Sequence, residues 1–117
     1  MPEMPWTVEF YRNARGESPA FDFVDKLPVR ERAVVTRVIG LLERYGPLLR
    51  MPYARHLEAD LWELRAGAGR VLYFLYDNGR FILLHAYRKK TDKTPAREIA
   101  TARRRMRDYR ERHTNEH

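Results

Sequence analysis

The sequence contains no cysteine, and this absence excludes disulfides, thiolate metal sites and thiol nucleophiles. Its single serine, Ser18, directly precedes Pro19, which is the place of a helix cap and not of a nucleophile. No apolar run approaches the roughly 18 residues that a membrane span needs. No basic segment followed by an apolar stretch opens the chain, and no glycine-rich loop joins a strand to a helix. We therefore expect a cytoplasmic protein with no secretory signal, no membrane contact, no nucleotide-binding loop and no cofactor.

The positive charge of the chain is concentrated in one block. The chain has 117 residues and a net charge of +7, and eleven basic against four acidic residues fall between Arg88 and Arg112. That block alone carries the whole net charge, so the rest of the chain is balanced. Such a block indicates a polyanionic partner, with nucleic acid the leading candidate, or else a solvated basic helix.

The composition predicts one folded domain over residues 1–117, because 44% of the residues are apolar and 12% are aromatic. Residues 113–117 are expected to form a frayed tail. Residues 6–11 alternate as a short strand does. Ser18 and Pro19 begin a short helix that turns Phe21, Val24 and Leu27 to one face. A longer helix runs from Pro28 to Gly46, with apolar residues at helical spacing: Val35, Val38, Leu42 and Tyr45.

The second half of the chain predicts a meander and a last helix. Residues 48–60 are expected to be irregular. Strands are predicted over 61–65, 70–77 and 80–87. Thr94 and Pro95 are expected to cap a basic helix with a narrow apolar stripe: Ile99, Ala102, Met106 and Tyr109. The fold class is therefore α+β, an antiparallel sheet with two N-terminal helices and a basic C-terminal helix.

The turn chemistry predicts how the strands pair. Asn78 and Gly79 favour a two-residue hairpin in which both positions have positive φ. The predicted cross-strand pairs are Tyr76–Phe81, Phe74–Leu83, Leu72–His85 and Arg70–Tyr87, followed by Arg65–Arg70, Glu63–Leu72 and Leu61–Phe74. A slip of one residue would turn these side chains to the other face of the sheet.

This pairing predicts two different faces. One is apolar throughout and must be covered, which we assign to the two N-terminal helices: Trp62, Leu64, Val71, Tyr73, Leu75, Ile82, Leu84 and Ala86. The other is apolar only near the hairpin: Leu61, Phe74, Tyr76, Phe81 and Leu83. Its opposite end gathers polar side chains, and the chain continues from it into further cations: Glu63, Arg65, Arg70, His85 and Tyr87, then Arg88, Lys89 and Lys90.

The polar end of the sheet predicts an anion site. Arg65 and Arg70, placed side by side, repel each other unless an anion lies near them, and guanidinium binds phosphate bidentately. His85 can exchange protons near neutral pH, and Tyr87 can donate a hydrogen bond or stack on a base. With Glu63 added, these groups suffice for metal-free RNA cleavage. The alternative is an ordinary cross-strand ion network with a half-buried, satisfied His85.

Two other sets of residues have simpler explanations. His56, Glu58 and Asp60 alternate as hard-metal ligands can, but such a set often arises by chance, so we predict no metal site. Arginines on the free faces of the predicted helix 28–46 are expected to be solvated and not functional.

The residues of the second half resemble a known family. The segments that carry the resemblance are 61–65 (Leu-Trp-Glu-Leu-Arg), 69–74 (Gly-Arg-Val-Leu-Tyr-Phe), 84–91 (Leu-His-Ala-Tyr-Arg-Lys-Lys-Thr), 93–95 (Lys-Thr-Pro) and 98–99 (Glu-Ile). They are similar to the phage-derived, HigB-like branch of the RelE/ParE toxin superfamily, and the Arg-Lys-Lys-Thr-x-Lys-Thr-Pro run before a basic helix is the most specific part. The resemblance spans residues 6–109 and agrees with the predicted element order.

The resemblance implies a toxin of a type II toxin–antitoxin system that cleaves mRNA on the ribosome and so contacts ribosomal RNA. It implies a helix-turn-helix antitoxin as partner, and contact with operator DNA only through that antitoxin. Arg70 matches an arginine that opens the central strand, and Lys89 and Lys90 match basic residues at the end of the last strand. In the family these contact the scissile phosphate.

We accordingly expect catalytic roles for Arg70, Lys90, His85, Glu63 and Tyr87, and RNA or phosphate binding by Arg65, Arg88, Lys89 and Lys93. The chain departs from RelE at two places. Leu61 and Glu63 stand where RelE has lysines, and Ala96 lies near its C-terminal tyrosine, so the general base and acid do not carry over. Two other functions stay open: a ParE-like gyrase inhibitor, and a non-catalytic basic nucleic-acid-binding module.

Overall fold

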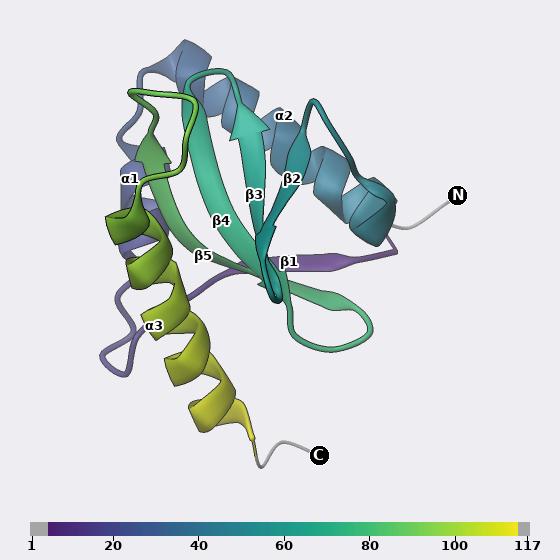
Figure 1. Cartoon of the computed structure of the whole chain (residues 1–117), viewed down its shortest axis with the longest axis vertical. Coiled ribbons are helices and arrows are strands. Elements are labelled where there is room, and N and C mark those ends of the chain that lie inside the picture. Colours follow the sequence, from purple (N-terminus) through teal and green to yellow (C-terminus); the bar gives the residue numbers. More distant parts are fainter. Residues whose placement is uncertain (1–4, 115–117) are drawn as a thin grey trace.

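The structure, a computed structural model, describes residues 5–114 as a five-stranded sheet between helices. Two helices lie on one face of the sheet and the third crosses the other face (Figure 1). The elements are β1 (Thr7–Phe10), α1 (Pro19–Asp25), α2 (Val29–Tyr45), the 3-10 turn η1 (Gly46–Leu48), β2 (Ala54–Glu58), β3 (Leu61–Ala66), β4 (Gly69–Leu75), β5 (Arg80–Arg88) and α3 (Ala96–His113). No helix of the described residues is long and apolar enough to cross a membrane.

The two N-terminal helices begin and end as their sequences predict. The Phe21 amide donates to the Ser18 hydroxyl at 3.3 Å, and Pro19 opens α1. Gly46 ends α2 with a positive φ of 54°, and its amide donates to the Leu42 carbonyl. A side chain at Gly46 would meet the Trp6 ring at 2.3 Å. Glycine is therefore required there both by conformation and by space.

The sheet order is β1-β5-β4-β3-β2, and β2 to β5 pair antiparallel as expected. Two features correct the sequence interpretation. First, β1 runs parallel to β5, with Val8 beside Phe81, which the long connection through the intervening elements permits. Second, residues 54–58 form the edge strand β2, although residues 48–60 were expected to be irregular. The sheet is therefore mixed, and mostly antiparallel.

The strand pairing is as predicted at one end of the sheet and not at the other. Arg65 lies opposite Arg70, Glu63 opposite Leu72, Leu72 opposite His85 and Arg70 opposite Tyr87, which confirms those pairs. Beyond His85 the register shifts, so Tyr73 lies opposite Leu83, and Leu75 opposite Phe81. The predicted pairs Phe74–Leu83 and Tyr76–Phe81 are therefore wrong, because Leu84 bulges out of the ladder.

The hairpin turn also differs from the prediction. Four residues, Tyr76 to Gly79, separate β4 from β5. Neither Asn78 nor Gly79 has a positive φ. The Asp77 carboxylate instead accepts the Gly79 amide at 3.0 Å, so a side chain closes this turn.

Because of the bulge, four residues of β5 lie on the face of the sheet opposite to the one predicted. Phe81 and Leu83 pack with α1 and α2, and Ile82 and Leu84 pack beneath α3, the reverse of the prediction. The other residues of the predicted apolar face do lie toward the two N-terminal helices: Trp62, Leu64, Val71, Tyr73, Leu75 and Ala86. The sheet therefore has a hydrophobic core on each face.

Helix α3 begins and ends differently from the prediction. Pro95 is its N-cap residue and no side chain caps it, because the Thr94 hydroxyl binds elsewhere. The apolar stripe is confirmed, with Ala102, Met106 and Tyr109 buried. His113 belongs to the helix and stacks on Tyr109 at 3.8 Å, so the predicted frayed tail does not begin there. Residues 115–117 of that tail lie outside the described residues.

Candidate active site

The predicted polar cluster forms on the α3 side of the sheet, at the end away from the β4–β5 turn. Arg65, Arg70 and Tyr87 occupy one row across β3, β4 and β5. Glu63, Leu72 and His85 occupy the row below. The correct register at this end brings together five strand residues that the sequence assigned to the site: Glu63, Arg65, Arg70, His85 and Tyr87. Arg88, the last residue of β5, instead pairs with Glu31 of α2.

Arg70 is held at the centre of the cluster and is only 5% exposed. Its Nη1 atom donates to the Gly67 carbonyl at 2.7 Å and to the Gly69 carbonyl at 2.8 Å. Its Nε and Nη2 atoms have no hydrogen-bond partner among residues 5–114. Burial and the neighbouring Arg65 lower the pKa of Arg70 from its ordinary value, with Glu63 opposing. One edge of a fixed guanidinium is thus left for an anion.

Glu63 is buried at 1% exposure and holds three side chains together. Oε1 accepts from Arg55 at 3.2 Å. Oε2 accepts from the Thr94 hydroxyl at 2.7 Å and from the Tyr87 hydroxyl at 3.3 Å. Both carboxylate oxygens are therefore occupied, so the geometry suits a residue that positions its neighbours.

Arg55 and Thr94 are the members of the cluster that sequence reasoning missed. Arg55 lies on β2 directly opposite Glu63, and its Nη2 atom also donates to the Thr94 hydroxyl at 3.1 Å. Its Nε atom is buried without a hydrogen-bond partner among the described residues. Arg55 and Glu63 have opposite charges and flank a turn at Ala59 and Asp60. This pattern in the sequence could have indicated that the two side chains pair.

Tyr87 is buried and stays protonated at neutral pH. Burial, together with the negative charge of Glu63, raises the pKa of Tyr87 to about 12. Its ring stacks on the His85 ring, with centroids 5.7 Å apart and planes 24° apart. The Tyr87 hydroxyl is therefore a proton donor in this site, not a base.

His85 is held between two charged groups of α3. Its Nε2 atom lies 2.6 Å from a Glu98 carboxylate oxygen, and Arg105 donates to its Nδ1 atom at 3.2 Å. Because arginine is always a donor, Nδ1 must carry no proton, and Nε2–H donates to Glu98. Burial lowers the pKa of His85 from its ordinary value, Arg105 also lowers it, and the hydrogen bond to Glu98 opposes them. His85 is thus neutral with both nitrogens engaged.

The basic residues at the end of β5 and after it divide into paired and unpaired side chains. Arg88 pairs with Glu31 at 2.5 Å, and Lys89 pairs with Asp92 at 3.0 Å. Lys90 and Lys93 are exposed and make no ion pair within the described part of the chain. The Arg65 guanidinium donates to the Met51 sulfur at 3.5 Å and makes no ion pair with residues 5–114. Arg65, which neighbours Arg70, and Lys90 and Lys93 in the loop after β5 therefore make no ion pair among the described residues.

The three alternating residues that could have bound a metal, His56, Glu58 and Asp60, bind other groups of this chain. Glu58 pairs with Arg103 at 2.5 Å, and Asp60 pairs with Arg110 at 2.6 Å. His56 Nε2 lies 2.7 Å from the Ala59 carbonyl oxygen. Within residues 5–114 no three His, Asp or Glu side chains form a group that could hold a metal ion. Part of the basic face of α3 thus binds the β2–β3 turn of its own chain.

Comparison with known proteins places these residues inside a family. Residues 22–107 match the family described as phage derived protein Gp49-like. Among solved structures, a chain of the toxin–antitoxin complex RelBE2 from Mycobacterium tuberculosis is similar at 26% identity and a TM-score of 0.55. The similarity covers 73% of this chain and 99% of that chain. Comparison with curated proteins gives no match.

Proposed function

The chain belongs to the Gp49-like family of phage-derived proteins, and we propose that it is the toxin of a toxin–antitoxin pair that cleaves mRNA during translation. The likeness to RelBE2 supports a RelE-type toxin with a protein antitoxin. We further propose that this antitoxin is a helix-turn-helix protein encoded beside the toxin, and that the pair binds its own operator through the antitoxin.

The observation that carries the enzymatic part of the proposal is the fixed guanidinium of Arg70. Two backbone carbonyls hold Nη1, at 2.7 and 2.8 Å, while Nε and Nη2 have no partner among the described residues. An arginine immobilised in this way can meet a phosphate with two parallel hydrogen bonds. It loses little conformational entropy on binding, because its side chain is already ordered.

The proposed reaction is attack of a ribose 2′-hydroxyl on the adjacent phosphorus. The new O2′–P bond closes a 2′,3′-cyclic phosphate while the P–O5′ bond breaks. Water takes the proton of the 2′-hydroxyl, and the leaving 5′-oxygen gains a proton from the protein. Negative charge grows on the phosphoryl oxygens in the transition state, and fixed cations stabilise it. Arg70 and Lys90 would hold these oxygens. Arg65 and Lys93 would hold the neighbouring phosphates of the strand, and Lys89 and Arg88 would join them by exchanging Asp92 and Glu31 for phosphate.

We assign proton donation to Tyr87, because its pKa of about 12 keeps the hydroxyl protonated until the leaving oxygen develops charge. The proton that this hydroxyl donates to Glu63 in the free protein would turn to the leaving oxygen, and water would then replace it. Glu63 and His85, which the sequence suggested for proton transfer, receive positioning roles. Glu63 orients the Tyr87 hydroxyl at 3.3 Å. His85 supports the face of the Tyr87 ring.

A reconstituted cleavage assay tests the proposal. Purified protein is added to ribosomes that carry a defined mRNA with a vacant A site, and cleavage is mapped by primer extension. We expect cuts within the A-site codon, and cleavage at least tenfold slower for Lys90→Ala, while Arg37→Ala, on the exposed face of α2, cleaves normally. Absence of cleavage with the unmodified protein would refute the enzymatic proposal.

A second function is favoured by one specific observation. Glu63 and His85 are both fully engaged, so neither is a free general base. An inhibitor of gyrase of the ParE type would need no such base. Growth arrest accompanied by DNA damage and intact mRNA would support this alternative, whereas arrest with cleaved mRNA would exclude it.

A further inference from the structure

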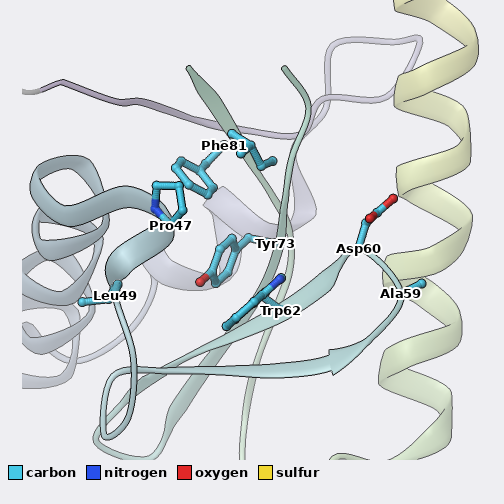
Figure 2. A pocket seen from close by; sticks show the side chains of 8 residues that line it. Pro47, Leu49, Ala59, Asp60, Trp62, Tyr73 and Phe81 are labelled. Atoms are coloured by element: carbon cyan, nitrogen blue, oxygen red, sulfur yellow. The ribbon is translucent and has the colours of Figure 1, made fainter. Parts of the chain in front are cut away.

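A second candidate site lies on the opposite face of the sheet from Arg70. A pocket of about 270 Å³ opens between η1 and strands β3 to β5, beside the end of α2 (Figure 2). Its walls are mostly aromatic and apolar: Pro47, Leu49, Trp62, Tyr73, Leu75 and Phe81. Small-molecule sites usually enclose about 300–1,000 Å³. This volume therefore suits one large side chain better than a nucleotide.

A polar group without a partner lies in the wall of this pocket. Tyr73 is 3% exposed as a whole residue, and its hydroxyl, which makes no hydrogen bond to a described residue, is the part that solvent reaches. Figure 2 shows that hydroxyl pointing toward the space between Leu49 and Trp62. Among the described residues, Arg55 Nε is the buried side-chain polar atom without a partner, so the Tyr73 hydroxyl is reached by solvent and is free to donate to a ligand. The pocket thus offers one hydrogen-bond donor in an apolar setting.

Exposed apolar residues adjoin the lining residues in the sequence. Leu48 stands between Pro47 and Leu49, and Tyr45 lies two residues before Pro47; these two exposed residues are here called the rim. The exposed Met51 instead contacts Arg65 at 3.5 Å. Leu48 alone is 77% exposed. Clustered exposed apolar residues around a pocket are typical of protein interfaces.

The charge at the rim is positive. The Arg50 guanidinium lies 5.4 Å from the centre of the Trp62 ring, and Arg44 is exposed on the last turn of α2. Asp60, the acidic residue of the pocket wall, is paired with Arg110 at 2.6 Å. Arg50 makes no ion pair with a described residue, so a partner segment that approaches Trp62 meets this positive charge and an acidic segment is favoured.

We propose that this pocket is the anchor site of the antitoxin, where an acidic antitoxin segment inserts one large apolar side chain and a backbone carbonyl of that segment accepts the Tyr73 hydroxyl. The inference rests on the proposed toxin function, because it takes the antitoxin as the occupant. The pocket and Arg70 lie on opposite faces of the sheet, so occupation of the pocket does not require contact with the phosphate site. An antitoxin anchored here would leave Arg70 uncovered unless another part of it reaches around the sheet.

The test uses the full-length toxin and the purified product of the adjacent reading frame, with binding measured by calorimetry. Leu48→Asp places a negative charge on the rim at an exposed position, so the fold is preserved. Val29→Asp is its matched control, because Val29 is an exposed apolar residue at the other end of α2. Tyr73→Phe removes only the hydroxyl. We expect Kd to rise at least tenfold for Leu48→Asp and about fivefold for Tyr73→Phe, and to change less than twofold for Val29→Asp.

Unchanged affinity of both Leu48→Asp and Tyr73→Phe would overturn the inference. It would also be overturned if the toxin alone were a dimer that Leu48→Asp converts to a monomer, since the occupant would then be a second copy. Ribosomal cleavage by toxin alone is measured in parallel and should be equal for wild type and Leu48→Asp. Loss of cleavage in the wild type would refute the proposed ribonuclease while leaving the binding result intact, so the two failures are distinguishable.

Discussion

The Thr94 hydroxyl donates a hydrogen bond of 2.7 Å to the buried carboxylate of Glu63. This bond joins the segment before α3 to the middle of β3. It explains why Thr94 does not cap the helix, because its hydroxyl is already used. The same carboxylate binds Arg55 and Tyr87, so one buried group connects β2, β3, β5 and the start of α3.

Glu63→Gln should destabilise the protein. The amide keeps the shape of the side chain but removes the negative charge that Arg55 faces. Its NH2 group also cannot accept a hydrogen bond, whereas both carboxylate oxygens of Glu63 do. We expect the free energy of unfolding to fall by about 2 kcal/mol in urea titrations. Glu31→Gln, which breaks the exposed pair with Arg88, should cost less than about 1 kcal/mol. Equal losses for the two variants would contradict the assigned role of Glu63.

Thr94→Val should lower stability where Thr94→Ser does not. Valine is similar in shape but cannot donate to Glu63 or accept from Arg55. We expect a loss of about 1–3 kcal/mol for valine, because Glu63 loses a donor inside the protein. Serine keeps the hydroxyl and should cost less than half as much. Thermal unfolding of the three proteins checks this order, and a valine variant as stable as the serine variant would contradict it.

The stability of the fold should depend on pH through His85. Its pKa is lowered from the ordinary value of 6.5 in the folded protein, so the unfolded chain binds a proton at a pH where the folded protein does not. This contribution to stability is complete above pH 6.5 and is lost as pH falls toward the folded pKa. Between pH of about 7.5 and 5, the free energy of unfolding should fall more steeply for the wild type than for His85→Gln. Parallel curves would refute the buried, neutral imidazole.

Gly46→Ala and Gly40→Ala should have opposite effects. A methyl group at Gly46 would collide with the Trp6 ring at 2.3 Å and would sit at a φ of +54°, so we expect a loss of about 1–3 kcal/mol. Gly40 lies inside α2 with nothing within 4 Å of an added Cβ. Alanine there should stabilise the helix by about 0.5–1 kcal/mol. Calorimetric melting temperatures give both signs, and a neutral Gly46→Ala would contradict the packing of Trp6.

The sequence predicts the local parts of the structure well because local chemistry determines them. Ser18 caps α1, Gly46 ends α2, and the short turn after Ala66 sets Arg65 opposite Arg70. The pairing of Arg65 with Arg70 puts Glu63 on the same face of the sheet as Arg70, and it therefore predicts most of the candidate site. Register at this end follows from one short connection, which the sequence displays directly.

The errors arise where distant parts of the chain decide the outcome. The bulge at Leu84 lets Ile82 and Leu84 pack under α3. The sequence of β5 alone does not indicate that a helix covers these two residues. Strand β2 lacks a strong strand sequence and forms because β3 offers it an edge. Arg55 was missed for that reason, and with it the buried environment that occupies Glu63.

Mapping of mRNA 5′ ends in cells that express the protein tests the central proposal most directly. The wild type should arrest growth and produce cuts in phase with codons, and Arg37→Ala should do the same. Arg70→Ala should reduce cleavage by about 100- to 1,000-fold, because it removes the fixed cation at the phosphate, and circular dichroism of the purified variant establishes that it is folded. A folded Arg70→Ala variant that cuts mRNA as fast as the wild type would contradict the assignment of this site.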